Sequence, residues 1–184
     1  MKAYHFLKAN MCGGWSNEPP WEIGEERELK GGKIELCLRG YHSSPSWLDA
    51  LLYAPGPMAC IVQISKPIQK NETKYVSRKR KLIDARYAEK ALSHWAYDCA
   101  ERALKKTKVR DPRSWNAIAL VRLYNEGQAT REQSEAAWDA AWDIAWNVAW
   151  HATVGDVARA AEIRWQKRRL NWYMNKLFKE VKNE

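Results

Sequence analysis

Apolar residues in the first 85 positions come in short runs separated by stretches rich in glycine and proline, which is a pattern of strands and loops. The run Met58–Ile64 is apolar apart from Gln63 and has the length of a strand, so we expect it to be the central strand of a sheet. Lys33–Leu38 alternates polar with apolar residues, as a half-buried strand does. Two further short strands are expected at Ala3–Leu7 and Trp21–Gly24.

One short helix is expected in this half, over Trp47–Tyr53. Ser44 or Ser46 can cap it, because a serine hydroxyl accepts a hydrogen bond from the first free N–H groups of a helix. The Pro55-Gly56-Pro57 sequence ends it.

From about residue 85 onward, apolar residues repeat at spacings of three and four, the period of an amphipathic helix. Asp111-Pro112 has the form of an N-cap followed by proline at the first helical position. Thr130 and Gln133 form a capping box, in which the side chain of each residue bonds the backbone N–H of the other. Four helices are therefore expected, over residues 85–106, 112–125, 130–152 and 157–182.

The third of these helices contains a four-residue repeat built on Ala-Trp, with tryptophan at Trp138, Trp142, Trp146 and Trp150. Successive tryptophans drift by about 40° around a helix and form a slanted ridge, which favours packing against neighbouring helices or a second copy of the chain. The alternative is an exposed platform on which nucleic-acid bases stack, but such platforms carry Lys or Arg between the rings. This repeat carries Asp139 and Asp143.

These patterns predict an α+β protein, with a small N-terminal mixed sheet and one short helix followed by an all-helical C-terminal layer of about four helices. We expect a strand-rich domain over residues 1–85. A helical, tryptophan-rich region over residues 86–184 is expected to pack on it or on a partner.

The composition narrows the possible partners. A formal net charge of +9 favours nucleic acid, a nucleotide or an acidic protein as ligand. The chain shows neither a secretory signal pattern nor an apolar run of membrane-spanning length, so we expect a cytoplasmic protein with no membrane partner. The four cysteines are widely spaced without a Cys-x-x-Cys pair, which favours free thiols and no metal site.

The sequence lacks the phosphate-binding loop, dinucleotide, zinc-protease, hydrolase and kinase motifs, which disfavours those enzyme classes. The densest polar cluster runs from Cys37 to Pro45, between an expected strand and an expected helix, where anions often bind. We expect this cluster to contribute ligand-binding residues together with the first strand: His5, Arg39, Tyr41, His42 and Ser44. The alternative is structural: Gly40 makes a turn, His42 bonds a local carbonyl and Ser44 caps the helix.

Two basic segments extend the candidate site. In the stretch from Lys66 to Arg86, the side chains Lys74, Arg78 and Arg80 are candidate anion ligands, although lysine and arginine on an edge strand also serve to block unwanted pairing. A second basic patch is expected on the last helix and could join the first in one phosphate-binding surface. It comprises Arg164, Lys167, Arg168, Arg169, Lys176 and Lys179.

The first 85 residues also resemble an uncharacterised family found in phages and prophages. The resemblance rests on a Cys-x-x-Gly-aromatic-His motif, here Cys37–His42, and on four flanking elements. These are Tyr4-His5, Trp21–Gly24, Met58–Ile64 and the Lys-rich segment Lys74–Arg80. The resemblance implies a phage or prophage source, and therefore the host cytoplasm, without implying an activity.

We therefore expect a non-enzymatic binding protein of phage origin that engages a polyanionic ligand, either nucleic acid or a nucleotide signal, and blunts a host defence system. One alternative is a nucleotide-cofactor transferase of the ADP-ribosyltransferase kind, with Glu35 as candidate catalytic carboxylate. Another is an inhibitor that binds an acidic host protein through exposed tryptophans. No cofactor can be named from the sequence.

Overall fold

The computed structural model describes residues 1–184 except 15–17, 109, 111, 131, 134–155 and 180–184. The described part combines an antiparallel sheet and a short helix with long helices, so the expected α+β class is confirmed. The chain divides into two compact units. Residues 1–89 with the C-terminal residues from Leu177 form the first, and residues 90–176 form the second.

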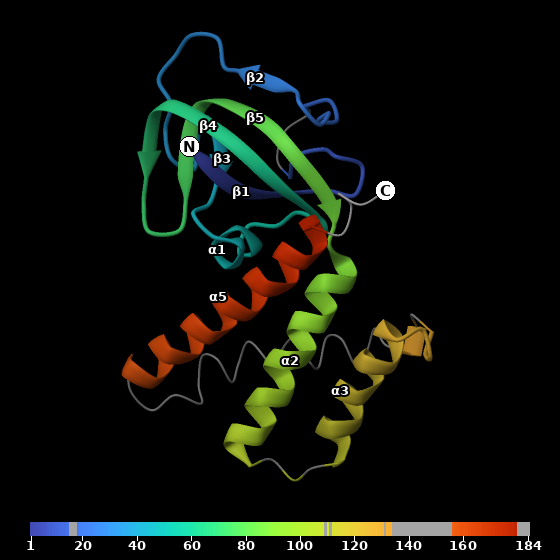
Figure 1. Ribbon diagram of the computed structural model, residues 1–184. Coiled ribbons are helices and arrows are strands. Elements are labelled where there is room, and N and C mark those ends of the chain that lie inside the picture. The colour runs from blue at the N-terminus through green and yellow to red at the C-terminus, as the bar shows by residue number, and fades with distance from the viewer. Residues whose placement is uncertain (15–17, 109, 111, 131, 134–155, 180–184) are drawn as a thin grey trace. The chain divides into compact units, whose positions relative to one another are not determined.

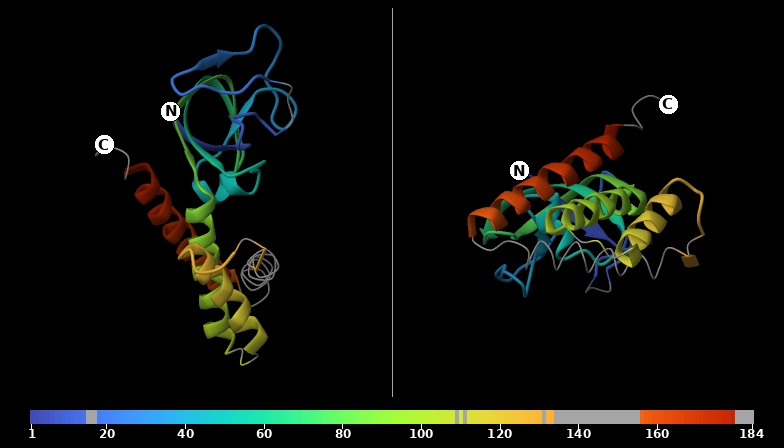
Figure 2. Two further views of the ribbon diagram at one scale, coloured as in Figure 1. Left: turned by 90° about the vertical axis from the view of Figure 1, so that its right-hand side faces the viewer. Right: turned by 90° about the horizontal axis from the view of Figure 1, so that it is seen from below.

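The sheet of the first unit has five strands, with order β1-β4-β5-β2 and β3 paired with β5 (Figure 1). Their bounds are β1 Lys2–Leu7, β2 Glu26–Glu28, β3 Tyr41–Ser43, β4 Met58–Lys70 and β5 Tyr75–Tyr87. Strands β4 and β5 form a long hairpin that coils strongly, as Figure 2 shows. At its tip, Asn71 Oδ1 accepts hydrogen bonds from the N–H groups of Thr73 and Lys74, a side-chain-stabilised turn.

Helix α1, Trp47–Leu51, follows β3 and is capped by Ser46, whose Oγ accepts a hydrogen bond from the Asp49 N–H at 3.3 Å. Of the two serines predicted to cap this helix, Ser46 does so. The indole of Trp47 packs on Tyr4, with ring centroids 4.4 Å apart, which ties the helix to β1. The apolar core of the sheet includes Ala3, Leu7, Val62, Ile64 and Leu82.

Three expectations about this sheet are wrong. Lys33–Leu38 forms a turn closed by an isolated bridge between Glu35 and Arg39, because Cys37 adopts a φ of 69° that no strand tolerates. Trp21–Gly24 is also irregular, with Gly24 at a φ of 90°, and the short strand begins later, at Glu26. The basic segment forms β5, which is paired on both sides and is therefore an interior strand rather than an edge strand.

The second unit contains α3 (Pro112–Asn125) and nearly all of α2 (Glu89–Thr107) and α5 (Asp156–Lys179). Within this unit α2 packs along α5 through paired side chains: Trp95 Nε1 donates to the Gln166 carbonyl at 3.2 Å, and Arg102 pairs with Glu162. The capping box at Thr130 and Gln133 is present, with reciprocal hydrogen bonds of 2.8 and 3.3 Å. The remainder of the expected helix over 130–152, with its four tryptophans and the proposed oligomer contact, lies outside the described residues.

Candidate functional site

Six of the eight expected ligand residues in the first unit line one cavity of about 530 Å³, here called the Arg80 pocket. These residues are His5, Tyr41, His42, Ser44, Lys74 and Arg80. They come from β1, β3, the segment before α1, the hairpin tip and β5, so only the pairing of the sheet brings them together. The volume is within the range of pockets that bind small molecules.

Arg80 is the residue that gives this pocket its chemistry. Its side chain is 4% exposed, and its Nη1 donates to the His42 carbonyl at 2.8 Å. Its Nε has no hydrogen-bond partner, and it forms no ion pair within the described part of the chain. Burial lowers the pKa of Arg80 from 12.5 to about 10, so the group stays charged near neutral pH at a cost of roughly 3 kcal/mol.

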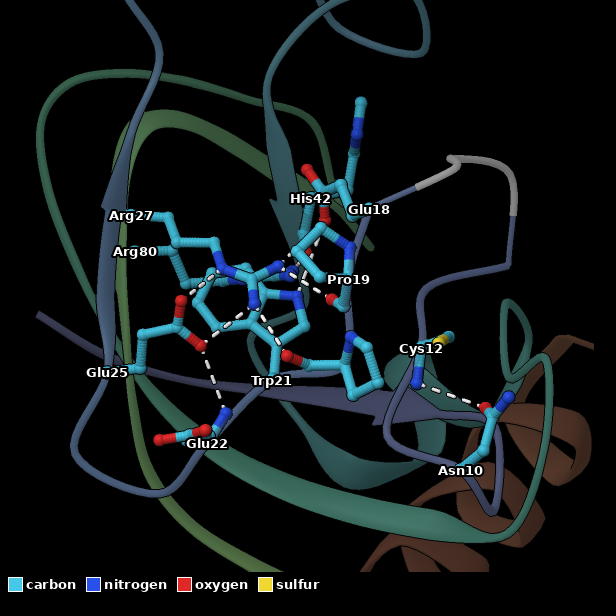
Figure 3. Close-up of polar contacts among 11 residues, drawn as sticks. Asn10, Cys12, Glu18, Pro19, Trp21, Glu22, Glu25, Arg27, His42 and Arg80 are labelled. Atoms are coloured by element: carbon cyan, nitrogen blue, oxygen red, sulfur yellow. Dashed lines mark hydrogen bonds and ion pairs between the residues drawn. The ribbon is translucent and has the colours of Figure 1, made fainter.

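Aromatic rings hold the guanidinium in place. Its Cζ lies 4.4 Å from the centroid of the buried Trp21 ring (Figure 3). It lies 5.2 Å from the centroid of the Tyr41 ring. Arg27 also contacts Trp21, at 4.1 Å, but it is paired with Glu25 at 2.5 Å and bonded to the carbonyls of two prolines. Arg27 is thus held in an ion pair with a neighbouring carboxylate, whereas Arg80 forms no ion pair with any described residue.

One carboxylate lies on the pocket wall. Glu18 accepts a hydrogen bond from Trp21 Nε1 at 3.3 Å and lies 3.8 Å from Arg27 Nη1. It raises the pKa of Arg80, but less than burial lowers it. The pocket therefore retains a positive charge from Arg80 and Lys74.

The two histidines differ in what holds them. The Nε2 atom of His42 accepts a hydrogen bond from the Cys37 N–H at 2.9 Å, and the ring also bonds the backbone of Gly40. Burial, with Lys74 and Arg80 nearby, lowers the pKa of His42. The ring is thus neutral and fixed by local backbone, in line with the structural interpretation of this residue.

His5 is neutral for the same reasons. Burial, followed by Arg80 and His42, holds the pKa of His5 well below its ordinary value of 6.5. Its ring makes no hydrogen bond to any residue that the structure describes, and it faces the pocket. His5 is therefore the pocket imidazole that is available to a ligand.

An ammonium group and an aromatic ring meet on the wall of the pocket. Lys74 Nζ lies 3.7 Å from the centroid of the Tyr53 ring and 3.6 Å from Cys37 Sγ. Tyr53 is 46% exposed, and its hydroxyl bonds Thr73 Oγ1 at 2.9 Å. Three further pocket residues were not predicted from the sequence: Tyr53, Glu18 and Ser43. Tyr53 follows a short helix, Glu18 lies in a loop and Ser43 ends a three-residue strand, and none of these positions carries a local motif.

Three expected residues lie elsewhere. The Arg39 guanidinium donates to the Lys30 carbonyl at 3.2 Å, and Arg78 donates to the Leu29 and Gly31 carbonyls at 3.1 and 2.9 Å. Both arginines therefore hold the loop before the Glu35 turn. Glu35 itself lies in that turn, and it is not among the residues lining the pocket.

The second basic patch lies on α5, in the other unit. Arg169 is paired with Asp98 at 2.5 Å, and the Tyr173 hydroxyl donates to the same carboxylate at 2.7 Å. Arg164 and Arg168 are exposed. Whether the two basic regions form one surface stays a prediction, since they belong to separate units.

The described residues contain neither a metal-binding cluster nor a membrane-spanning helix. No cluster of three or more His, Cys, Asp or Glu there has the arrangement of a metal site. No helix among them combines the length and apolar character that crossing a bilayer requires. The four cysteines are free thiols, and burial raises the pKa of Cys60 to about 12.

Fold and site together define an α+β protein whose N-terminal sheet carries a basic, histidine-lined pocket. The family model described as "Domain of unknown function (DUF7666)" matches residues 1–94, half of the chain. The chain therefore belongs to this family, and the predicted membership of an uncharacterised family is confirmed. Comparison with curated proteins and with solved structures finds no match.

Proposed function

We propose that the Arg80 pocket binds a phosphorylated ligand the size of a nucleotide, and that this binding is the function of the N-terminal unit. The observation that carries the proposal is Arg80: a buried guanidinium that, among the described residues, has no hydrogen-bond partner for its Nε and no ion-pair partner. A lone buried charge costs several kcal/mol, and an anion placed against it recovers part of that cost.

The polar groups of the pocket favour phosphate over other anions. Ser43 Oγ is buried without a hydrogen-bond partner, as is Arg80 Nε, and both residues line the pocket. Lys74 adds ammonium donors, and a neutral His5 supplies one ring N–H. A phosphate group offers three terminal oxygens that only accept hydrogen bonds, so it suits a wall made mainly of donors.

The rest of the pocket favours a nucleoside attached to that phosphate. A cavity of about 530 Å³ exceeds what a phosphate alone fills. Tyr53 offers a partly exposed ring beside Lys74, on which a base can stack.

The biological setting is part of the same proposal. The Cys37–His42 motif resembles proteins of phages and prophages, and a phage protein that sequesters a host nucleotide signal would weaken a defence system that depends on that signal. The absence of enzyme motifs from the sequence supports binding without turnover.

Calorimetric titration of the full-length protein with AMP, ADP and inorganic phosphate tests the proposal. We expect binding of at least one nucleotide, weakened at least tenfold by Arg80→Lys, because a point charge cannot replace a planar guanidinium, and severalfold by Lys74→Gln. Lys81→Gln is the matched control, since it removes one charge from the adjacent position of β5 and Lys81 does not line the pocket. Absence of binding by all three ligands, or equal losses in Lys74→Gln and Lys81→Gln, would refute the proposal.

A further inference from the structure

We infer that the exposed side of α5 is a second, independent binding surface, which takes single-stranded nucleic acid. Four residues spaced by four positions form a row along this helix: Arg164, Arg168, Trp172 and Lys176. All four are exposed. Residues at this spacing lie one above the other on a helix, so the row extends over about 18 Å.

Trp172 is the anchor of the row. Its side chain is 50% exposed, although Leu170 and Met174 on the same helix are completely buried. The Arg169 guanidinium lies 4.7 Å from the Trp172 ring centroid, and the Tyr173 ring meets it edge-on at 4.8 Å. These contacts hold the indole in position, so little conformational entropy is lost when a base stacks on it.

The charge along α5 around Trp172 is positive. From Ile163 to Lys179 the helix contains no acidic residue. Glu162, the residue directly before this stretch, is 7% exposed and is engaged by Arg102 and Lys106 of α2. Asp98 of α2 is engaged by Arg169 and Tyr173.

Arg164 and Arg168 consequently form no ion pair with any residue in the described ranges. Two exposed guanidinium groups beside an exposed indole fit a ligand that offers both phosphates and bases. In a duplex the bases are stacked on each other and present only their edges, whereas in a single strand their faces are available. The row therefore favours a single strand.

The row on α5 has the residue pattern of a base-stacking platform, which the sequence of the Ala-Trp repeat at residues 137–152 lacks. A stacking platform needs aromatic rings interleaved with Lys or Arg. The repeat interleaves its tryptophans with Asp139 and Asp143, whereas Trp172 has Arg168 four positions before it and Lys176 four positions after it.

Fluorescence anisotropy with a labelled 12-nucleotide oligo(dT) in 50 mM salt tests the inference on the full-length protein. We expect Trp172→Leu to weaken binding by roughly 5- to 100-fold, which is the effect of losing one stacked base. Trp172→Phe keeps a ring and should stay within about threefold of the wild type. An abasic 12-mer, which offers phosphates without bases, should bind wild type and Trp172→Leu equally weakly.

The charge contribution is measured by the salt dependence of the same binding. Removing one phosphate contact from a single strand changes the slope of log affinity against log salt by about 0.7, and we expect this change in Arg168→Gln. Arg122→Gln on α3 is the control, because Arg122 is equally exposed on a helix but paired with Glu126. Circular dichroism checks that each variant is folded.

Any of three results would overturn the inference: wild-type affinity in Trp172→Leu, equal affinity for the 12-mer and its duplex, or equal slope changes in Arg168→Gln and Arg122→Gln. The pocket proposal does not depend on this outcome, since Arg80→Lys should leave oligo(dT) binding unchanged.

Discussion

Replacing Arg80 by methionine should abolish ligand binding while leaving the stability of the protein nearly unchanged. Methionine has a comparable length and no charge, so it removes the roughly 3 kcal/mol that burial of the guanidinium costs. It also removes the hydrogen bond to the His42 carbonyl, worth about 1.5 kcal/mol when the donor is charged. The ring contacts with Trp21 and Tyr41 contribute about 1 kcal/mol each.

These contributions nearly cancel, so we expect the free energy of unfolding to change by less than about 1.5 kcal/mol in Arg80→Met. A larger loss of stability is expected for a buried arginine that forms an ion pair. Breaking a buried ion pair typically costs about 3–5 kcal/mol, because the remaining partner is left uncompensated.

Urea unfolding followed by circular dichroism measures the stability, and thermal unfolding with and without the nucleotide identified by calorimetry measures binding. The wild type should gain thermal stability with nucleotide, and Arg80→Met should gain none. Lys81→Met controls for the loss of a charge from β5. A loss of more than about 3 kcal/mol in Arg80→Met, or an undiminished nucleotide effect, would contradict the reasoning.

Two further predictions concern pH and backbone geometry. Because the pKa of His5 is lower in the folded protein than its ordinary 6.5, the unfolded chain binds the proton more readily, so the free energy of unfolding should fall as the pH drops from 7 toward 5. His5→Gln should flatten this dependence in urea titrations at several pH values, and an unchanged slope would contradict the assignment. Gly40→Ala should destabilise the protein by at least about 2 kcal/mol, because φ is 142° and a Cβ would lie 2.2 Å from Val76 Cγ2. Gly24→Ala, at a φ of 90° with no atom within 4 Å of the added Cβ, should cost only about 1 kcal/mol in the same unfolding assay, and equal losses would show that the clash at Gly40 is relieved.

Elements governed by local signals were predicted well. The three- and four-residue period marks α2, the proline at position 112 starts α3, and the capping box at Thr130 and Gln133 forms as expected. Met58–Ile64, apolar apart from Gln63, lies in β4, an interior strand with β1 on one side and β5 on the other. In each case neighbouring residues alone carry the physical cause, whether a helical period, a cap or apolar burial.

The predictions were wrong where the structure of a segment depends on residues distant in the sequence. β5 is rich in lysine and arginine, which favoured an edge strand, yet it pairs with β4 on one side and with β2 and β3 on the other. The sheet tolerates this because Arg80 is covered by Trp21 and bonded to the His42 carbonyl, while Lys79 pairs with Glu26 of β2. No local sequence pattern around β5 predicts these contacts.

The candidate site shows the same division. Residue type was enough to select His5, His42, Lys74 and Arg80, because basic and imidazole side chains are the groups that bind phosphate. The sequence alone could not separate Arg80 from Arg78, two positions earlier on the same strand. The tertiary fold separates them: the Arg78 guanidinium bonds the loop carbonyls at Leu29 and Gly31, whereas Arg80 is buried in the pocket and forms no ion pair with a described residue. The burial of each arginine and its hydrogen-bond partners depend on groups tens of residues away in the sequence. Burial and partners together determine which charged side chain is available to a ligand.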